Sequence, residues 1–120
     1  MIQKTEEEIN DEIEASVSEH GIKSAYISGK ITGMEAEARE LFDAAEREVL
    51  AYGYLPVNPF KLNHDHDKSW RAFMRSDIKA LCDCDAIYML TNWRESPGAT
   101  IELEIANHLE MDVIHQHRKI

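Results

Sequence analysis

The chain has 120 residues, of which 43% are hydrophobic and 30% are charged; this is the size and composition of one ordinary globular domain. No apolar run approaches the roughly 18 residues of a membrane-spanning helix, and the first residues show no signal-peptide pattern. We therefore expect a cytoplasmic protein without a membrane partner. The net charge of −10 argues against a duplex nucleic-acid partner, because binding a duplex requires a basic patch.

Residues 1–22 are predicted to form an acidic helical extension that precedes an α/β domain over residues 23–120. Residues 1–20 carry seven acidic side chains and one lysine. Ile9, Ile13 and Val17 recur every four residues and form one narrow apolar stripe on the predicted helix. Such a stripe suits packing on an edge of the domain or on a partner chain.

The remaining sequence alternates short apolar strands with helices. Strands are predicted over residues 24–28, 54–57, 86–90 and 112–115, and helices over residues 34–52, 70–82 and 97–110. This alternation predicts an α/β fold with a parallel sheet covered by helices. Ligands bind such sheets beyond the carboxyl ends of the strands, where the strand order reverses. The loops over residues 29–33 and 91–98 emerge at that edge.

Two acidic side chains break the apolar pattern of their helices. At about 100° per residue, Asp77 lies about 340° from Trp70, in the middle of the apolar arc of its helix. Glu102 lies about 100° from Ile101, also inside an apolar arc, whereas Glu104 points away. A single buried acid is more often structural, in an ion pair or a hydrogen bond. Two such acids beside one ligand crevice indicate carboxylates that divide nucleophile and acid roles at an acetal-like carbon.

Other polar motifs carry weaker signals. The pair His64 and His66, flanked by aspartates, could bind a metal, but a solvated loop is favoured, and we predict no metal site. Residues 29–33 lack the dinucleotide-binding glycine fingerprint, so no dinucleotide cofactor is expected. Ser96 and Gly98 open a helix whose free N–H groups suit an anion or a sugar hydroxyl, although Ser96 also serves as a helix cap.

Three segments, taken in order, resemble the nucleoside 2-deoxyribosyltransferase superfamily, especially its small deoxyribosyltransferase-like branch. They are Tyr26-Ile-Ser-Gly-Lys-Ile-Thr-Gly33, Arg75-Ser-Asp77 followed eight residues later by Asp85, and Ser96-Pro-Gly-Ala-Thr-Ile-Glu102. The resemblance covers about residues 24–115. It implies a flavodoxin-like or Rossmann-like three-layer sandwich with a four- to five-stranded parallel sheet. It also implies a homodimer or larger homo-oligomer in which a neighbouring subunit completes the pocket.

The resemblance further implies a deoxyribosyltransferase or N-glycohydrolase that acts on a nucleoside or nucleotide without a metal or redox cofactor. Glu102 would attack the anomeric carbon, the base would leave, and water or a second base would take the sugar. Asp77 would position the nucleophile or the sugar. In the nucleotide-hydrolysing branch an arginine that holds phosphate stands at the position of Thr32, and Lys30 is its candidate substitute. The predicted substrate-binding residues are Tyr26, Ser28, Gly29, Lys30, Ile31, Thr32, Asn92, Ser96 and Gly98.

Two alternatives stay open at this point. One is a module on the same fold that binds a nucleotide derivative without converting it. The other is an assembly protein in which the acidic N-terminal helix matters most. Release of a free base from a deoxynucleoside separates the enzyme from both alternatives.

Overall fold

The computed structural model describes residues 23–117, and its centre is a four-stranded parallel sheet. The strands are β1 (Lys23–Ser28), β2 (Tyr54–Val57), β3 (Ala86–Met89) and β4 (Asp112–His115), in the order β2-β1-β3-β4. All three strand pairs are parallel. The predicted parallel α/β sheet is therefore confirmed. The predicted helical extension over residues 1–22 lies outside the described residues.

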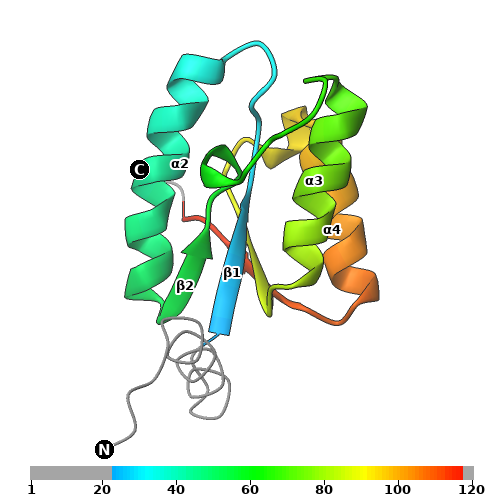
Figure 1. The fold of residues 1–120 in the computed structure, drawn as a ribbon. Helices are drawn as coiled ribbons and strands as arrows, with labels where there is room; N and C mark the ends of the chain where they lie inside the picture. The colour runs from blue at the N-terminus through cyan, green and yellow to red at the C-terminus, as the bar shows by residue number, and fades with distance from the viewer. Residues whose placement is uncertain (1–22, 118–120) are drawn as a thin grey trace, which may run out of the picture.

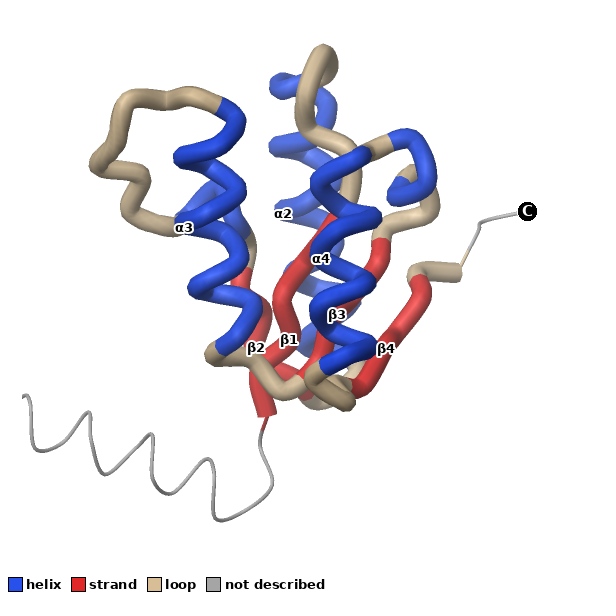
Figure 2. The backbone as a smooth tube through the Cα atoms, turned by 90° about the vertical axis from the view of Figure 1, so that its right-hand side faces the viewer, coloured by secondary structure: helices blue, strands red, loops and turns tan. Residues whose placement is uncertain are grey.

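Helices cover both faces of this sheet and make three layers (Figures 1 and 2). Helix α2 (Glu35–Ala51) lies on one face, while α3 (Trp70–Cys82) and α4 (Pro97–His108) lie side by side on the other. Two short 3-10 turns, η1 (Pro59–Lys61) and η2 (Trp93–Glu95), follow β2 and β3. None of the helices described is long and apolar enough to cross a membrane.

The helix ends follow from local sequence. Ser96 caps α4, because its hydroxyl accepts the Ala99 N–H at 3.1 Å, and Pro97 occupies the first helical position. Ser69 caps α3 in the same way, accepting the Ala72 N–H at 3.1 Å. These two caps, which the sequence predicts, fix where α3 and α4 begin and therefore which of their side chains reach the sheet edge.

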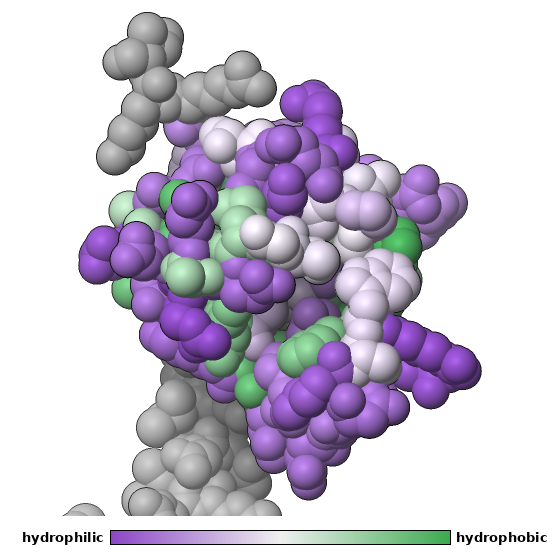
Figure 3. All heavy atoms as spheres, turned by 90° about the horizontal axis from the view of Figure 1, so that it is seen from above, coloured by the Kyte–Doolittle hydropathy of each residue, from purple (hydrophilic) through white to green (hydrophobic). Residues whose placement is uncertain are grey.

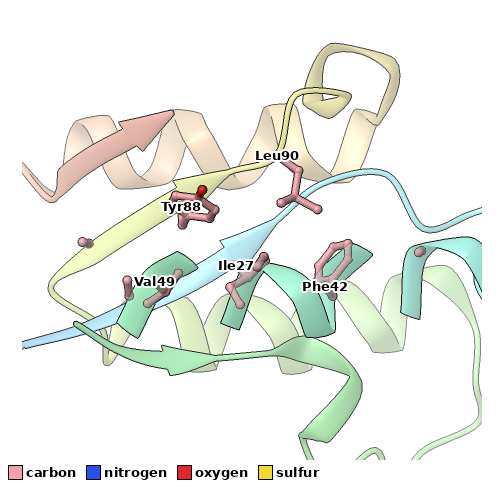
Figure 4. Close-up of a cluster of buried hydrophobic side chains, with 9 residues drawn as sticks. Ile27, Phe42, Val49, Tyr88 and Leu90 are labelled. Carbon is pink, nitrogen blue, oxygen red and sulfur yellow. The ribbon is translucent and has the colours of Figure 1, made fainter. Parts of the chain in front are cut away.

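Strand β1 is buried on both faces of the sheet. Its successive side chains point to opposite faces, so alternate residues pack under different helices. Ala25 and Ile27 join the apolar cluster against α2, where Figure 4 shows Ile27 facing Phe42 and Val49. Tyr26 belongs to the cluster on the opposite face, beneath α3 and α4. Tyr26 and Ser28 share that face, because alternate residues of a strand point the same way. The hydroxyl groups of Tyr26 and Ser28 therefore both point toward α3 and α4.

The strand order reverses between β1 and β3, and this is the switch point where ligands bind in such sheets. The chain leaves β1 through Gly29, which packs closely on Leu90 at the end of β3. A Cβ atom placed on Gly29 would lie 2.9 Å from the Leu90 Cβ atom. Glycine is therefore required here for β1 and the Leu90 segment to approach each other at the ligand edge.

Candidate active site

A cavity of about 560 Å³ opens at the carboxyl edge of the sheet. It is lined by the end of β1, the start of α2, the segment after β2, the inner face of α3 and the start of α4. Figure 3 looks onto this edge and shows the surface hollowed near its centre, with hydrophobic side chains beside the hollow and mostly hydrophilic ones farther out. The volume falls in the range of small-molecule pockets.

Glu102 lies in this cavity and is only 5% exposed. Both of its carboxylate oxygens accept hydrogen bonds from β1: the Tyr26 hydroxyl donates to Oε2 at 2.6 Å, and the Ser28 hydroxyl donates to Oε1 at 2.7 Å. Burial raises the pKa of Glu102 to about 7, although the two hydroxyl donors lower it and the nearby charge of Asp77 raises it further. The side chain is thus buried, oriented from both sides and titratable near neutral pH.

Asp77 lines the same cavity from α3 and is 8% exposed. Its environment differs from that of Glu102, because the buried Oδ1 atom has no hydrogen-bond partner among the described residues. Burial raises the pKa of Asp77 to about 7. A buried carboxylate without donors is costly when it is ionised, so this environment favours the neutral acid.

The two acids therefore differ in a way that separates their roles. When the pair holds a single proton, that proton favours Asp77, because only Glu102 has two hydroxyl donors to stabilise its charge. The cavity then presents one ionised carboxylate and one neutral carboxylic acid to a bound molecule. This is the pairing that nucleophilic displacement with protonation of a leaving group requires. As the helical pattern predicts, Asp77 and Glu102 are buried while Glu104 is exposed.

The segment between β2 and α3 differs from expectation. The sequence favours a solvated loop at His64 and His66, but the His64 side chain is only 14% exposed and lines the cavity. Its ring packs edge-on against Phe73 of α3, with ring centres 4.8 Å apart. The preference for a solvated loop is therefore wrong at His64. Within residues 23–117, no group of three or more His, Cys, Asp or Glu side chains could hold a metal ion.

Most of the predicted substrate-binding residues line the cavity, namely Tyr26, Ser28, Gly29, Ile31, Thr32, Ser96 and Gly98. Lys30 and Asn92 lie outside its lining. The Lys30 backbone N–H donates to the Asn92 side-chain oxygen at 3.0 Å, and the Lys30 ammonium lies 3.9 Å from a carboxylate oxygen of Glu95. The bond between Lys30 and Asn92 joins the two loops beside the cavity, and the binding roles of these two residues stay predictions.

Several lining residues escape the sequence prediction. Arg39 reaches the cavity from α2, with its guanidinium 4.7 Å from the centre of the Phe60 ring. Trp70, at the first position of α3, lines the cavity and is 53% exposed. Its aromatic character and its place in the apolar arc are signals that could have identified it. Arg39 gives no such signal, because an arginine on a helix usually faces solvent.

The strand order β2-β1-β3-β4 and the helices on both faces of the sheet define an α/β protein with a flavodoxin-like fold. The chain belongs to the family described as "Domain of unknown function (DUF4406)", whose profile matches residues 23–115. In structure it is similar to the 2-desoxiribosyltransferase from Leishmania mexicana, with a TM-score of 0.59 and 16% sequence identity. The match covers 78% of this chain and 63% of that protein, so the chain spans less than two thirds of its length. A comparison with curated proteins gave no match.

Proposed function

We propose that this protein cleaves the N-glycosidic bond of a 2-deoxyribonucleoside or its 5′-monophosphate, with Glu102 as nucleophile and Asp77 as acid. The observation that carries the proposal is the contrast between two buried acids in one cavity. Glu102 accepts two hydroxyl donors, whereas a buried oxygen of Asp77 accepts none. The similarity in fold to a 2-desoxiribosyltransferase supports the same chemistry.

The reaction takes place in two displacements. An oxygen of the ionised Glu102 attacks the anomeric carbon, the bond from that carbon to the base nitrogen breaks, and Asp77 gives its proton to the leaving base. A water molecule or a second base then attacks the same carbon. Its proton returns to Asp77, and the ester bond to Glu102 breaks to restore the carboxylate. Two inversions give overall retention of configuration.

The cavity offers surfaces for the other parts of such a substrate. Phe60 and Phe73 line it and give aromatic surface on which a base can stack. Arg39 and Lys68 are the cations of its lining and suit a 5′-phosphate. Hydrogen-bond donors near the start of α4 suit the sugar.

A screen of deoxynucleosides and their 5′-monophosphates for released base tests the proposal. Glu102→Ala is expected to abolish release while the far-ultraviolet circular dichroism stays that of the wild type. Glu104→Ala is the matched control, because Glu104 lies two residues away on α4 and is exposed; it should retain full release. Equal turnover in both variants would remove Glu102 from the mechanism. Tight binding in calorimetry without release would support a binding module instead.

We also propose that the protein acts as a homodimer or larger homo-oligomer. The large exposed side chain of Trp70 at the cavity gives a second copy an apolar contact beside the site. Light scattering of the full chain should give a mass above that of a single chain, and a monomer mass would contradict the proposal. Deleting residues 1–20 tests whether the acidic segment is needed for this assembly.

A further inference from the structure

The loop after β2 brings His64 to the buried oxygen of Asp77 and places His66 beside His64. The His64 Nε2 atom lies 3.8 Å from Asp77 Oδ1, the atom that has no hydrogen-bond partner among the described residues. Both histidine rings pack on Phe73, with ring centres 4.8 Å and 4.6 Å from it. Phe73 precedes Asp77 by one turn of α3, so this aromatic contact places the loop over the same helix face as the acid.

A chain of hydrogen bonds fixes which nitrogen of each ring carries the proton. The Lys68 backbone N–H donates to His66 Nδ1 at 3.1 Å, so His66 must carry its proton on Nε2. That Nε2–H lies 3.1 Å from His64 Nδ1, which therefore accepts. His64 is left with its own proton on Nε2, the ring nitrogen that faces Asp77.

The proton on His64 has a second acceptor nearby, because Nε2 donates to the Pro59 carbonyl oxygen at 2.8 Å. This bond is complete while Asp77 is neutral. Once Asp77 loses its proton, the new negative charge on a buried oxygen attracts the same N–H, and closing 3.8 Å to hydrogen-bond distance needs a shift of roughly 1 Å. The Lys68 ammonium, which donates to the His64 carbonyl oxygen, holds the loop from the other side.

We propose that His64 is a positioning residue for Asp77: His66 holds its ring with the proton on Nε2, ready to donate to the Asp77 carboxylate that forms when Asp77 releases its proton. The role assigned to Asp77 rests on the proposed function. His64 does not itself carry a proton to the substrate. It stabilises the ionised acid between the two displacements and thereby favours release of the proton to the leaving base.

The other charged or titratable groups that face this cavity also bear on the ionisation of Asp77. They are Tyr26 on β1, Glu35 and Arg39 on α2, Lys68 on the loop and Glu102 on α4. Because they are unchanged in variants of the histidine pair, a difference between such variants and the wild type reports on the pair.

Nuclear magnetic resonance tests the inference without any substrate, so the result stands whether or not the protein turns over a nucleoside. Labelled aspartate carboxyl carbons are titrated from about pH 4 to about pH 9, and the Asp77 signal is assigned from Asp77→Asn. His64→Leu keeps the ring's approximate volume and removes the donor, and it should raise the Asp77 pKa by about one unit, a tenfold change in ionisation constant. His64→Gln keeps an N–H donor at a similar reach and should return the pKa close to the wild-type value.

An unchanged or lowered Asp77 pKa in His64→Leu would overturn the inference. A rise of equal size in His64→Gln would also overturn it, because packing rather than the N–H group would then be responsible. Ring ¹⁵N shifts of the wild-type protein give a test that needs no variant at His64. The inference requires the His64 proton on Nε2 in the wild type and a partial shift toward Nδ1 in His66→Leu; a wild-type proton on Nδ1 would refute it.

Discussion

The Tyr26 hydroxyl donates the shorter of the two hydrogen bonds to Glu102. Removing this hydroxyl gives a quantitative prediction. Tyr26→Phe deletes one oxygen atom that donates to Glu102 Oε2 at 2.6 Å. A hydrogen bond to a charged group contributes about 1.5–3 kcal/mol, and about 1.4 kcal/mol corresponds to one pKa unit. Because this bond favours the ionised form, its loss should raise the pKa of Glu102 from about 7 to about 8 or higher.

The consequence is a slower reaction at neutral pH. The ionised fraction of Glu102 at pH 7 should fall from about one half to about one tenth or less, and base release with it by about fivefold or more. The assay is the pH profile of kcat/KM, in which the acidic limb should move to higher pH by about one unit or more. The midpoint of this limb is the quantity to compare. Its height is not compared, because Tyr26 also lines the cavity and its substitution can change the rate at every pH.

Tyr88→Phe is the matched control. The Tyr88 hydroxyl donates to Glu48 Oε1, also at 2.6 Å, but Tyr88 packs in the cluster against α2, on the opposite face of the sheet from Tyr26. The control should lose a hydrogen bond of the same length without moving the acidic limb. An unmoved limb in Tyr26→Phe, or a shift of equal size in Tyr88→Phe, would refute the reasoning.

Three further predictions concern stability and substrate choice. The folded-state pKa of Asp77 lies above its ordinary value of 3.8, at about 7, so ionising it costs stability as the pH rises from about 4 to about 7. Asp77→Asn should then be more stable than the wild type at pH 8 by roughly 2 kcal/mol, allowing for partial solvation, and no more stable at pH 3. Urea unfolding at the two pH values measures this, and equal stability at pH 8 contradicts it. Gly29→Ala should lower the unfolding free energy by about 1–3 kcal/mol, because the new Cβ atom meets Leu90; an unchanged urea midpoint would show that β1 and Leu90 separate freely. Arg39→Met should raise the KM for a 5′-monophosphate about tenfold and leave the KM for the nucleoside unchanged. Arg39 lines the cavity and no acid within 4 Å pairs with it in the described structure, so its guanidinium is free to bind a phosphate. Equal changes in KM for both substrates would place the phosphate elsewhere.

Periodicity was sufficient to place the two acids. Asp77 and Glu102 sit at helix positions whose neighbours are apolar, and helical geometry turns such positions toward the sheet whatever the rest of the fold does. The caps at Ser69 and Ser96 are equally local, because each depends on one side chain and the N–H group three residues later. Features of this kind can be read from a single sequence.

The histidine loop and the cations at the cavity could not be predicted in this way. Residues 58–68 have no hydrophobic period, and His64 is directed at Asp77 by packing on Phe73, which only the folded chain provides. Arg39 reaches the cavity because the pocket continues past the sheet edge to the start of α2. Lys30, which adjoins the motif in the sequence, is instead drawn to Glu95. Sequence position alone therefore does not tell which cations line the cavity.

The central claim is that the Glu102 carboxylate forms a bond to the sugar. Mass spectrometry of protein quenched during turnover of a deoxynucleoside tests it directly. We predict one deoxyribosyl adduct in the wild type, on the peptide that contains Glu102, and none in Glu102→Gln. Base released by the wild type with no adduct on that peptide, or an adduct that persists in Glu102→Gln, would contradict the account.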